Sequence, residues 1–150
     1  MRFVILALAL VQAEKPVAFE GRGRLVCLIE EMKEKYQAQA APGHEHLAGF
    51  RVEDKAAAGG ARYTTLLRNA GSEALFADRR FKERELRLYG RVFPSTSVLE
   101  VTRFQWYRDG KLMEVYYWCE VCSIRGVDPG PCACCQARVE LREAAADSGK

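Results

Sequence analysis

The sequence is poor in histidine and lacks the local motifs of several large enzyme classes. Its only histidines are His44 and His46, and it contains no G-x-S-x-G, P-loop, H-E-x-x-H or dinucleotide-binding fingerprint. Carboxylates such as Glu30, Asp78 and Glu100 are scattered, without a spacing that predicts acid–base chemistry. The sequence therefore indicates no reaction, and a non-enzymatic role is favoured.

Long apolar runs and an excess of one charge are also missing. The longest apolar run is the nine residues 3–11, whereas a membrane-spanning helix needs roughly 20. The 23 Lys and Arg oppose 20 Asp and Glu, giving a net charge of +3, and the two signs alternate, as in residues 79–85. This pattern is typical of a solvated face and does not by itself indicate nucleic-acid binding. With 150 residues and 49% hydrophobic content, the chain predicts one globular domain, alone or with a small appendage.

Cysteine is the abundant and informative residue type. Five of the six cysteines fall within seventeen residues, spaced as C-x2-C, a nine-residue loop and C-A-C-C (Cys119, Cys122, Cys132, Cys134 and Cys135). Two thiolate pairs across a short loop are the usual arrangement of a tetrahedral zinc site. The spacing predicts Zn²⁺ bound by Cys119, Cys122, Cys132 and Cys135, with Cys134 as a possible substitute for Cys135. Disulfides and thiol–disulfide exchange are the alternatives.

The N-terminus has the layout of a secretory signal. Met1-Arg2 precedes the apolar run, and Val11-Gln12-Ala13 precedes a polar stretch. The pattern predicts cleavage after Ala13 and export to the periplasm or the extracellular space. A buried first strand or helix is the alternative interpretation.

The middle of the chain predicts a mainly β fold. We expect a strand that bends at Gly21 and Gly23, a helix and a hairpin, then a short helix and three further strands, the last two joined by the Asp109-Gly110 turn. The ranges are 19–29, 30–41, 46–52, 62–67, 73–78, 85–93, 98–107 and 111–118. This order resembles the OB-fold, a small Greek-key barrel with a helix between its third and fourth strands. The resemblance implies an OB-like barrel with one or two short helices, followed by a C-terminal zinc ribbon.

The cysteine segment resembles the short heavy-metal-binding domain found beside copper and heavy-metal transport proteins. The shared features are an aromatic residue before Cys119, a P-G-x-C approach to Cys132 and a C-x2-C ending before an apolar-acidic strand. Cys122 stands where that family usually has His, and Gln136 replaces its usual Gly. Four sulfur ligands suit structural zinc better than copper exchange, so metal delivery or sensing is the runner-up.

Two further metal or thiol candidates are less specific. His44 and His46 form an H-x-H pair that can bind a metal on one face of a strand, if a third ligand joins them. Solvent-exposed loop histidines are the alternative interpretation. Cys27 lies within an apolar run, where a lone cysteine usually serves as a small core residue.

One face of the predicted barrel interleaves basic and aromatic side chains. The candidate ligand-binding residues are Arg87, Tyr89, Arg91, Arg103 and Trp106. Such a surface can bind single-stranded nucleic acid if the protein is not exported. Because the net charge is low and export is predicted, we expect an unknown protein or glycan partner instead, and no transmembrane segment in the mature chain.

Several segments together, including R-L-V-C-L-I-E-E, R-V-F-P-S-T-S-V-L-E-V and the cysteine region, are similar to a group of small exported bacterial proteins. This resemblance implies export and carries no activity with it. The expected organisation is a signal peptide (1–13), a barrel (14–117), a zinc ribbon (118–141) and a flexible tail (142–150). The resulting hypothesis is an exported, non-enzymatic binding or adaptor module.

Overall fold

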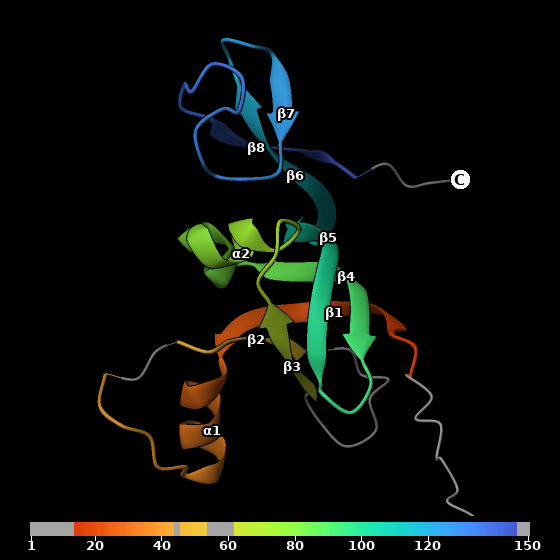
Figure 1. The fold of residues 1–150 in the computed structure, drawn as a ribbon, viewed down its shortest axis with the longest axis vertical. Helices are drawn as coiled ribbons and strands as arrows, with labels where there is room; N and C mark the ends of the chain where they lie inside the picture. The colour runs from red at the N-terminus through yellow and green to blue at the C-terminus, as the bar shows by residue number, and fades with distance from the viewer. Residues whose placement is uncertain (1–13, 44–45, 54–61, 147–150) are drawn as a thin grey trace, which may run out of the picture.

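The computed structural model describes residues 14–43, 46–53 and 62–146. The predicted signal peptide, residues 1–13, lies outside them. The described residues are mainly β, as predicted (Figure 1). The strands are β1 (Val17–Cys27), β2 (Ala48–Val52), β3 (Arg62–Leu67), β4 (Glu85–Phe93), β5 (Val98–Arg108), β6 (Lys111–Cys119), β7 (Ile124–Gly126) and β8 (Glu140–Ala145). The helices are α1 (Leu28–Tyr36), α2 (Glu73–Ala77) and the 3₁₀ helix η1 (Arg79–Glu83).

Five strands close into a ring in the order β1-β2-β3-β5-β4 and back to β1. Four of the pairings are antiparallel. The fifth is parallel and joins Thr65–Leu67 of β3 to Val98–Glu100 of β5. Closure requires β1 to serve two neighbours. Its segment Val17–Arg24 pairs with β4, and its segment Gly23–Cys27 pairs with β2.

Gly23 is the position at which β1 passes from one neighbour to the other. It pairs with Val52 on β2 and with Leu86 on β4. A Cβ at Gly23 would lie 1.9 Å from the carbonyl oxygen of Arg51, so a larger residue cannot fit without moving the backbone of β2. The bend predicted at the glycines of this strand is thus a point where two backbones approach closely.

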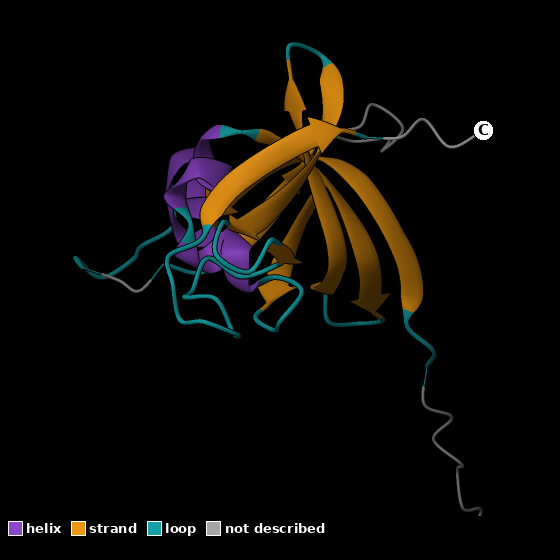
Figure 2. Ribbon diagram, turned by 90° about the horizontal axis from the view of Figure 1, so that it is seen from above, coloured by secondary structure: helices purple, strands orange, loops and turns teal. Residues whose placement is uncertain are grey.

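The core fills the ring and extends to the two short helical segments. Leu75 of α2 and Phe81 of η1 pack against the inward side chains of β4 and β5, and Phe81 is fully buried. Figure 2 shows the helices gathered on one side of the strands. The charged run 79–85, predicted to be a solvated face, therefore carries one apolar anchor.

Helix α1 lies against β2 and β3. Leu28 packs on Gly49, and Glu31 accepts hydrogen bonds from Arg51 Nη1 at 2.8 Å and from the Tyr63 hydroxyl at 2.7 Å. The helix was predicted to reach residue 41 but ends at Tyr36. Its residues are all at least partly exposed, so burial adds little to hold a further turn.

Beyond the ring, β6 continues into a second lobe. Its first residues pair with β5, Tyr117–Cys119 pair with β7, and Met113–Trp118 pair with β8 on the other edge. Figure 1 shows β7 and β8 together at the end of the molecule opposite α1. Among the described residues, no helix is long and apolar enough to span a membrane.

The prediction of a flexible tail over 142–150 has to be corrected for its first residues. They belong to β8, and Leu141 at the start of this strand packs against the core. Glu143 accepts a hydrogen bond from Trp106 Nε1 at 2.7 Å and pairs with Arg108. These contacts order residues 142–145, although their composition alone predicts a frayed chain end. Residues 147–150 lie outside the described part of the chain.

Candidate metal centre

Four cysteines converge at the end of the second lobe. The Sγ atoms of Cys119, Cys122, Cys132 and Cys135 all lie within 4.8 Å of one another, and Cys119 Sγ is 3.5 Å from Cys135 Sγ. In a tetrahedral site with Zn–S bonds of about 2.3 Å, the sulfurs are about 3.8 Å apart. A disulfide requires about 2.05 Å, and none of the six cysteines, all of them described, forms one. The four sulfurs therefore form a possible metal site, as the spacing predicted.

Two similar turns present these sulfurs. Each C-x2-C pair is followed by a residue in the left-handed region, Ser123 with φ 52° and Gln136 with φ 60°. In the second turn, the Gln136 N–H donates to the Cys132 carbonyl at 2.9 Å, and the Cys132 N–H donates to the Ala137 carbonyl at 2.8 Å. A glycine adopts this left-handed conformation without steric cost, whereas the side chain of Gln136 makes it strained.

The turns also set the ionisation of the thiols. The backbone N–H groups of Cys135 and Cys134 donate to the Cys132 sulfur and lower its pKa to about 7. The pKa of Cys122 is shifted in the opposite direction, because other thiols surround it. Hydrogen bonding to the Cys135 and Cys134 thiols, together with burial, raises its pKa above the ordinary range. One thiolate forms readily and further ionisation is opposed, so a bound cation is what would allow all four to ionise together.

The remaining thiols have distinct positions. Cys134 is exposed and is not among the four mutually close sulfurs, although its backbone N–H supports Cys132. Its predicted role as a substitute for Cys135 stays a prediction. Cys27 lies at the end of β1, far from the cysteine cluster in the sequence, and is partly buried in the wall of a cavity.

The predicted second metal site falls partly outside the described residues, because His44 is not among them. His46 is exposed and lines the same cavity as Cys27. Among the described residues, the cysteine cluster is the one group of three or more potential ligands that lie close enough to share a metal. The H-x-H site stays a prediction.

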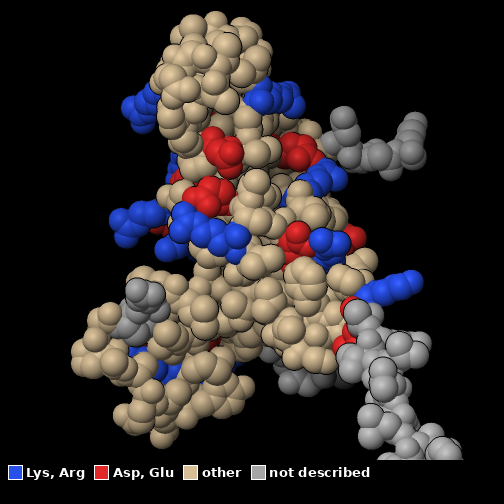
Figure 3. Space-filling view, viewed as in Figure 1, with Lys and Arg blue, Asp and Glu red and all other residues tan. Residues whose placement is uncertain are grey.

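The outer face of β4 and β5 carries most of the predicted ligand-binding residues. Tyr89 and Arg103 face each other across the strands, with the guanidinium 5.2 Å from the ring centroid. The arginines of this face, and Arg22 of the neighbouring strand β1, each form an ion pair with a glutamate (Arg22–Glu85, Arg87–Glu20, Arg91–Glu100 and Arg103–Glu114). Figure 3 shows acidic and basic side chains side by side around the middle of the molecule. Four positive charges are thus balanced by four negative ones, and the face has little attraction for a phosphate backbone.

Trp106 does not belong to this face, and its prediction as a ligand-binding residue is wrong. It is 5% exposed and packs in the core, with its ring centroid 5.5 Å from that of Phe81. The cause is a β-bulge where β4 and β5 shift register between Tyr89 and Gly90, leaving Thr102 as the additional residue. The extra residue reverses the alternation of β5, so that Phe104 and Trp106 turn inward.

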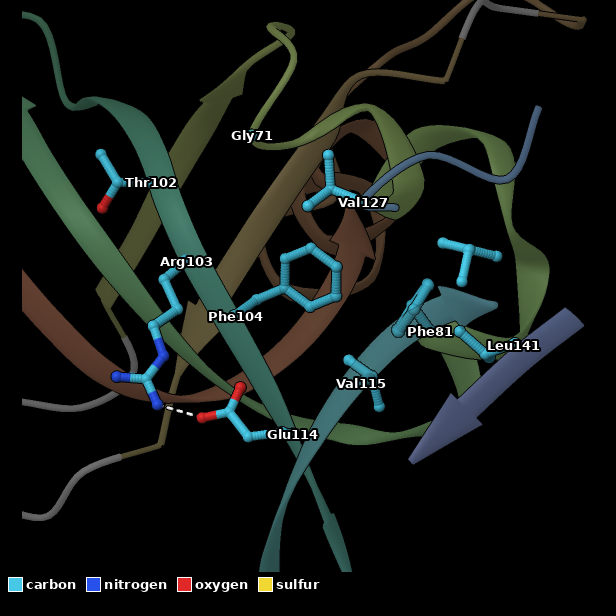
Figure 4. A pocket seen from close by; sticks show the side chains of 10 residues that line it. Gly71, Phe81, Thr102, Arg103, Phe104, Glu114, Val115, Val127 and Leu141 are labelled. Atoms are coloured by element: carbon cyan, nitrogen blue, oxygen red, sulfur yellow. Dashed lines mark hydrogen bonds and ion pairs between the residues drawn. The ribbon is translucent and has the colours of Figure 1, made fainter. Parts of the chain in front are cut away.

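A cavity of about 270 Å³ lies between the ring and the second lobe. Figure 4 shows Phe81 of η1 and Phe104 of β5 near Val115, Val127 and Leu141 of the second lobe, with the Arg103–Glu114 ion pair at one side. Val127 belongs to the loop that connects the two cysteine pairs. The cavity is therefore mainly apolar, and its rim charges neutralise each other.

Comparison with known proteins adds no further assignment to this centre. No protein family, no curated protein and no solved structure matches the chain significantly.

Proposed function

We propose that the protein is an exported, non-enzymatic binding or adaptor module, built from an OB-like barrel and a zinc ribbon. The observation that carries this proposal is the convergence of four thiols at the end of the second lobe. The barrel assignment is supported by the strand order β1-β2-β3-β5-β4, the parallel β3–β5 pairing and the position of α2 between β3 and β4.

The donor set supports Zn²⁺ as the metal. Thiolates select zinc, Cu(I) or iron–sulfur chemistry, and four of them at tetrahedral separations suit a structural zinc ion. Cys119, Cys122, Cys132 and Cys135 would fill its coordination sphere and leave no open position for a substrate. The ion would hold the loop 120–135 against the end of β6, whose first residues pair with β5 of the ring.

The same lobe offers a surface for a protein partner. Val121, Ile124 and Val127 expose 72%, 43% and 64% of their surface. Exposed aliphatic side chains gathered on one short segment are typical of an interaction site. A metal bound by the cysteines on both sides of this segment would restrict its movement, as an adaptor surface requires.

Elemental analysis of the purified full chain, combined with a thiol count, tests the proposal. We expect one zinc per chain and fast modification of no more than Cys27 and Cys134 until a chelator is added. Cys132→Ser should lose the metal, whereas Cys134→Ser, the same change two residues away, should retain it. Metal-free protein with its cysteines paired as disulfides would refute the proposal.

Metal handling remains the second candidate, and exposure is the observation that favours it. Cys122 and Cys135 are only partly buried, and the exposed Cys134 lies next to them in the chain. An incoming acceptor thiolate could reach such a site. Exchange of the bound metal with Cu(I) or a competing chelator within seconds would favour delivery, whereas retention for hours would favour the structural role.

A further inference from the structure

A second cavity has none of its described lining residues on β6, β7 or β8. It has a volume of about 300 Å³ and forms where the end of β1 and the start of β2 face α2 and η1. Its walls are apolar, and its polar groups are a thiol, an imidazole and two cationic side chains. The apolar residues are Leu25, Val26, Ala48, Leu75 and Phe76, and the polar ones are Cys27, His46, Arg68 and Lys82. This size is at the small end of ligand-binding pockets.

The two cations of this cavity differ in their pairing. Arg68 donates to both carboxylate oxygens of Glu73, at 2.5 and 2.8 Å, and lies 5.5 Å from the ring centroid of Phe76. Its charge is therefore neutralised. Lys82 forms no ion pair with any described carboxylate, and none of the described residues lining the cavity is acidic. Among the described residues, the cavity thus joins an apolar interior to one cation, Lys82, that has no carboxylate partner.

We infer that this cavity binds a small amphipathic monoanion, namely a carboxylate carried on an aromatic or branched aliphatic body. The body would lie among Leu25, Leu75 and Phe76, where burying apolar surface supplies the affinity. The carboxylate would face the Lys82 ammonium, which attracts it as a point charge. A ligand cation would meet Lys82 unfavourably, and a phosphate dianion would call for more donors than one lysine provides.

Two other cavities lack this combination. The cavity between the ring and the second lobe is apolar, with the Arg103–Glu114 ion pair at its rim. The hollow along α1 is lined by Leu28, Ile29, Met32, residues 38–41 and Leu47, without any charged side chain among its described lining residues. The inference names a ligand class for the binding module proposed above, and it rests on ring residues that do not contact the metal cluster.

Three probes that share one apolar body isolate the charge preference. The full chain is titrated with 3-phenylpropanoate, 3-phenylpropanamide and 3-phenylpropylamine, and binding is followed by amide chemical shifts. We expect the carboxylate to bind about three- to fivefold more tightly than the amide, because one exposed ion pair contributes that much. The amine should bind most weakly, and the shifts should centre on residues 25–27, 46–48 and 75–82.

Two lysine variants assign the preference. Lys82→Gln should bring the carboxylate down to the affinity of the amide, whereas Lys111→Gln, an exposed lysine in the β5–β6 hairpin, should leave the difference intact. Lys82 is exposed, so its replacement should not disturb the fold. Bound carboxylate should also slow the modification of Cys27 by N-ethylmaleimide at least threefold, as followed by peptide mass spectrometry.

Equal affinity for the carboxylate and the amide, or equal effects of the two lysine variants, would overturn the inference. So would shifts that centre elsewhere, or the absence of binding at millimolar carboxylate. Metal content is measured on the same samples to separate the two proposals. Zinc-containing protein without a carboxylate preference contradicts this inference alone, and metal-free protein that keeps the preference contradicts the zinc assignment alone.

Discussion

Replacing Tyr117 by Phe should weaken the connection between the ring and the second lobe. Tyr117, on β6, is 2% exposed, and its hydroxyl donates to Asp78 Oδ2 at 2.7 Å. Asp78, between α2 and η1, is 8% exposed and also accepts from Arg80. A hydrogen bond to a charged group contributes about 1.5–3 kcal/mol. Because Arg80 still pairs with Asp78 in the variant, we expect the low end, a loss of about 1.5 kcal/mol in the free energy of unfolding.

Urea unfolding followed by circular dichroism measures this loss, and the melting temperature should fall by about 3–6 °C for a chain of this size. Tyr116→Phe is the matched control. Tyr116 is the neighbour of Tyr117 on β6 and is only partly buried. Its ring, which stays in the variant, keeps the contact with the Arg125 guanidinium, 4.1 Å from the ring centroid. A loss below about 0.5 kcal/mol in Tyr117→Phe, or one equal to that of the control, would refute the reasoning.

The pH dependence tests the same contact through its acceptor. Hydrogen bonding from Arg80, and then from Tyr117, lowers the pKa of Asp78 below its ordinary value. A carboxylate whose folded pKa is depressed stabilises the fold above its unfolded pKa of about 3.9, and this stability is lost as pH falls through the folded pKa. The stability gap between wild type and Tyr117→Phe should therefore be full above about pH 5 and narrow below about pH 4. A gap unchanged between pH 7 and pH 3 would show that Asp78 is not the partner concerned.

Three further predictions concern the backbone and the N-terminus. Gly23→Ala should destabilise the ring strongly or prevent folding in a urea titration, because its Cβ would lie 1.9 Å from the Arg51 carbonyl oxygen. The control Gly130→Ala has open space around its Cβ and should be nearly neutral in the same titration. Gln136→Gly should raise stability by about 1 kcal/mol by removing a left-handed side-chain-bearing residue, and an unchanged midpoint would count against strain in that turn. Protein recovered from its native host should begin at Glu14, as checked by intact-mass spectrometry; an intact Met1 on cytoplasmic protein would contradict export.

Local signals in the sequence were sufficient for many of the elements. Strand β4 follows the alternation of its residues and has the bounds predicted for it, 85–93. Asp109 and Gly110 adopt φ values of 50° and 76°, the left-handed pair that this two-residue hairpin turn requires. The cysteine spacing predicted which sulfurs meet, because a C-x2-C turn restricts where its own two thiols can lie. Each of these features is decided by contacts between residues close together in the chain.

Contacts between residues distant in the chain were out of reach of such patterns. The parallel β3–β5 pairing that closes the ring joins residues more than thirty positions apart. The bulge at Thr102 is visible only against β4, and it decides that Trp106 is core and not ligand-binding surface. Nothing in the composition of β8 indicates that Glu143 will accept a hydrogen bond from Trp106. By itself the sequence determined most of the strands of the ring, the hairpin turn and which four cysteines converge. The tertiary structure decided which charges neutralise each other, which cavity holds Lys82 without a described carboxylate partner and how the second lobe attaches, because burial and electrostatic pairing depend on which strands become neighbours.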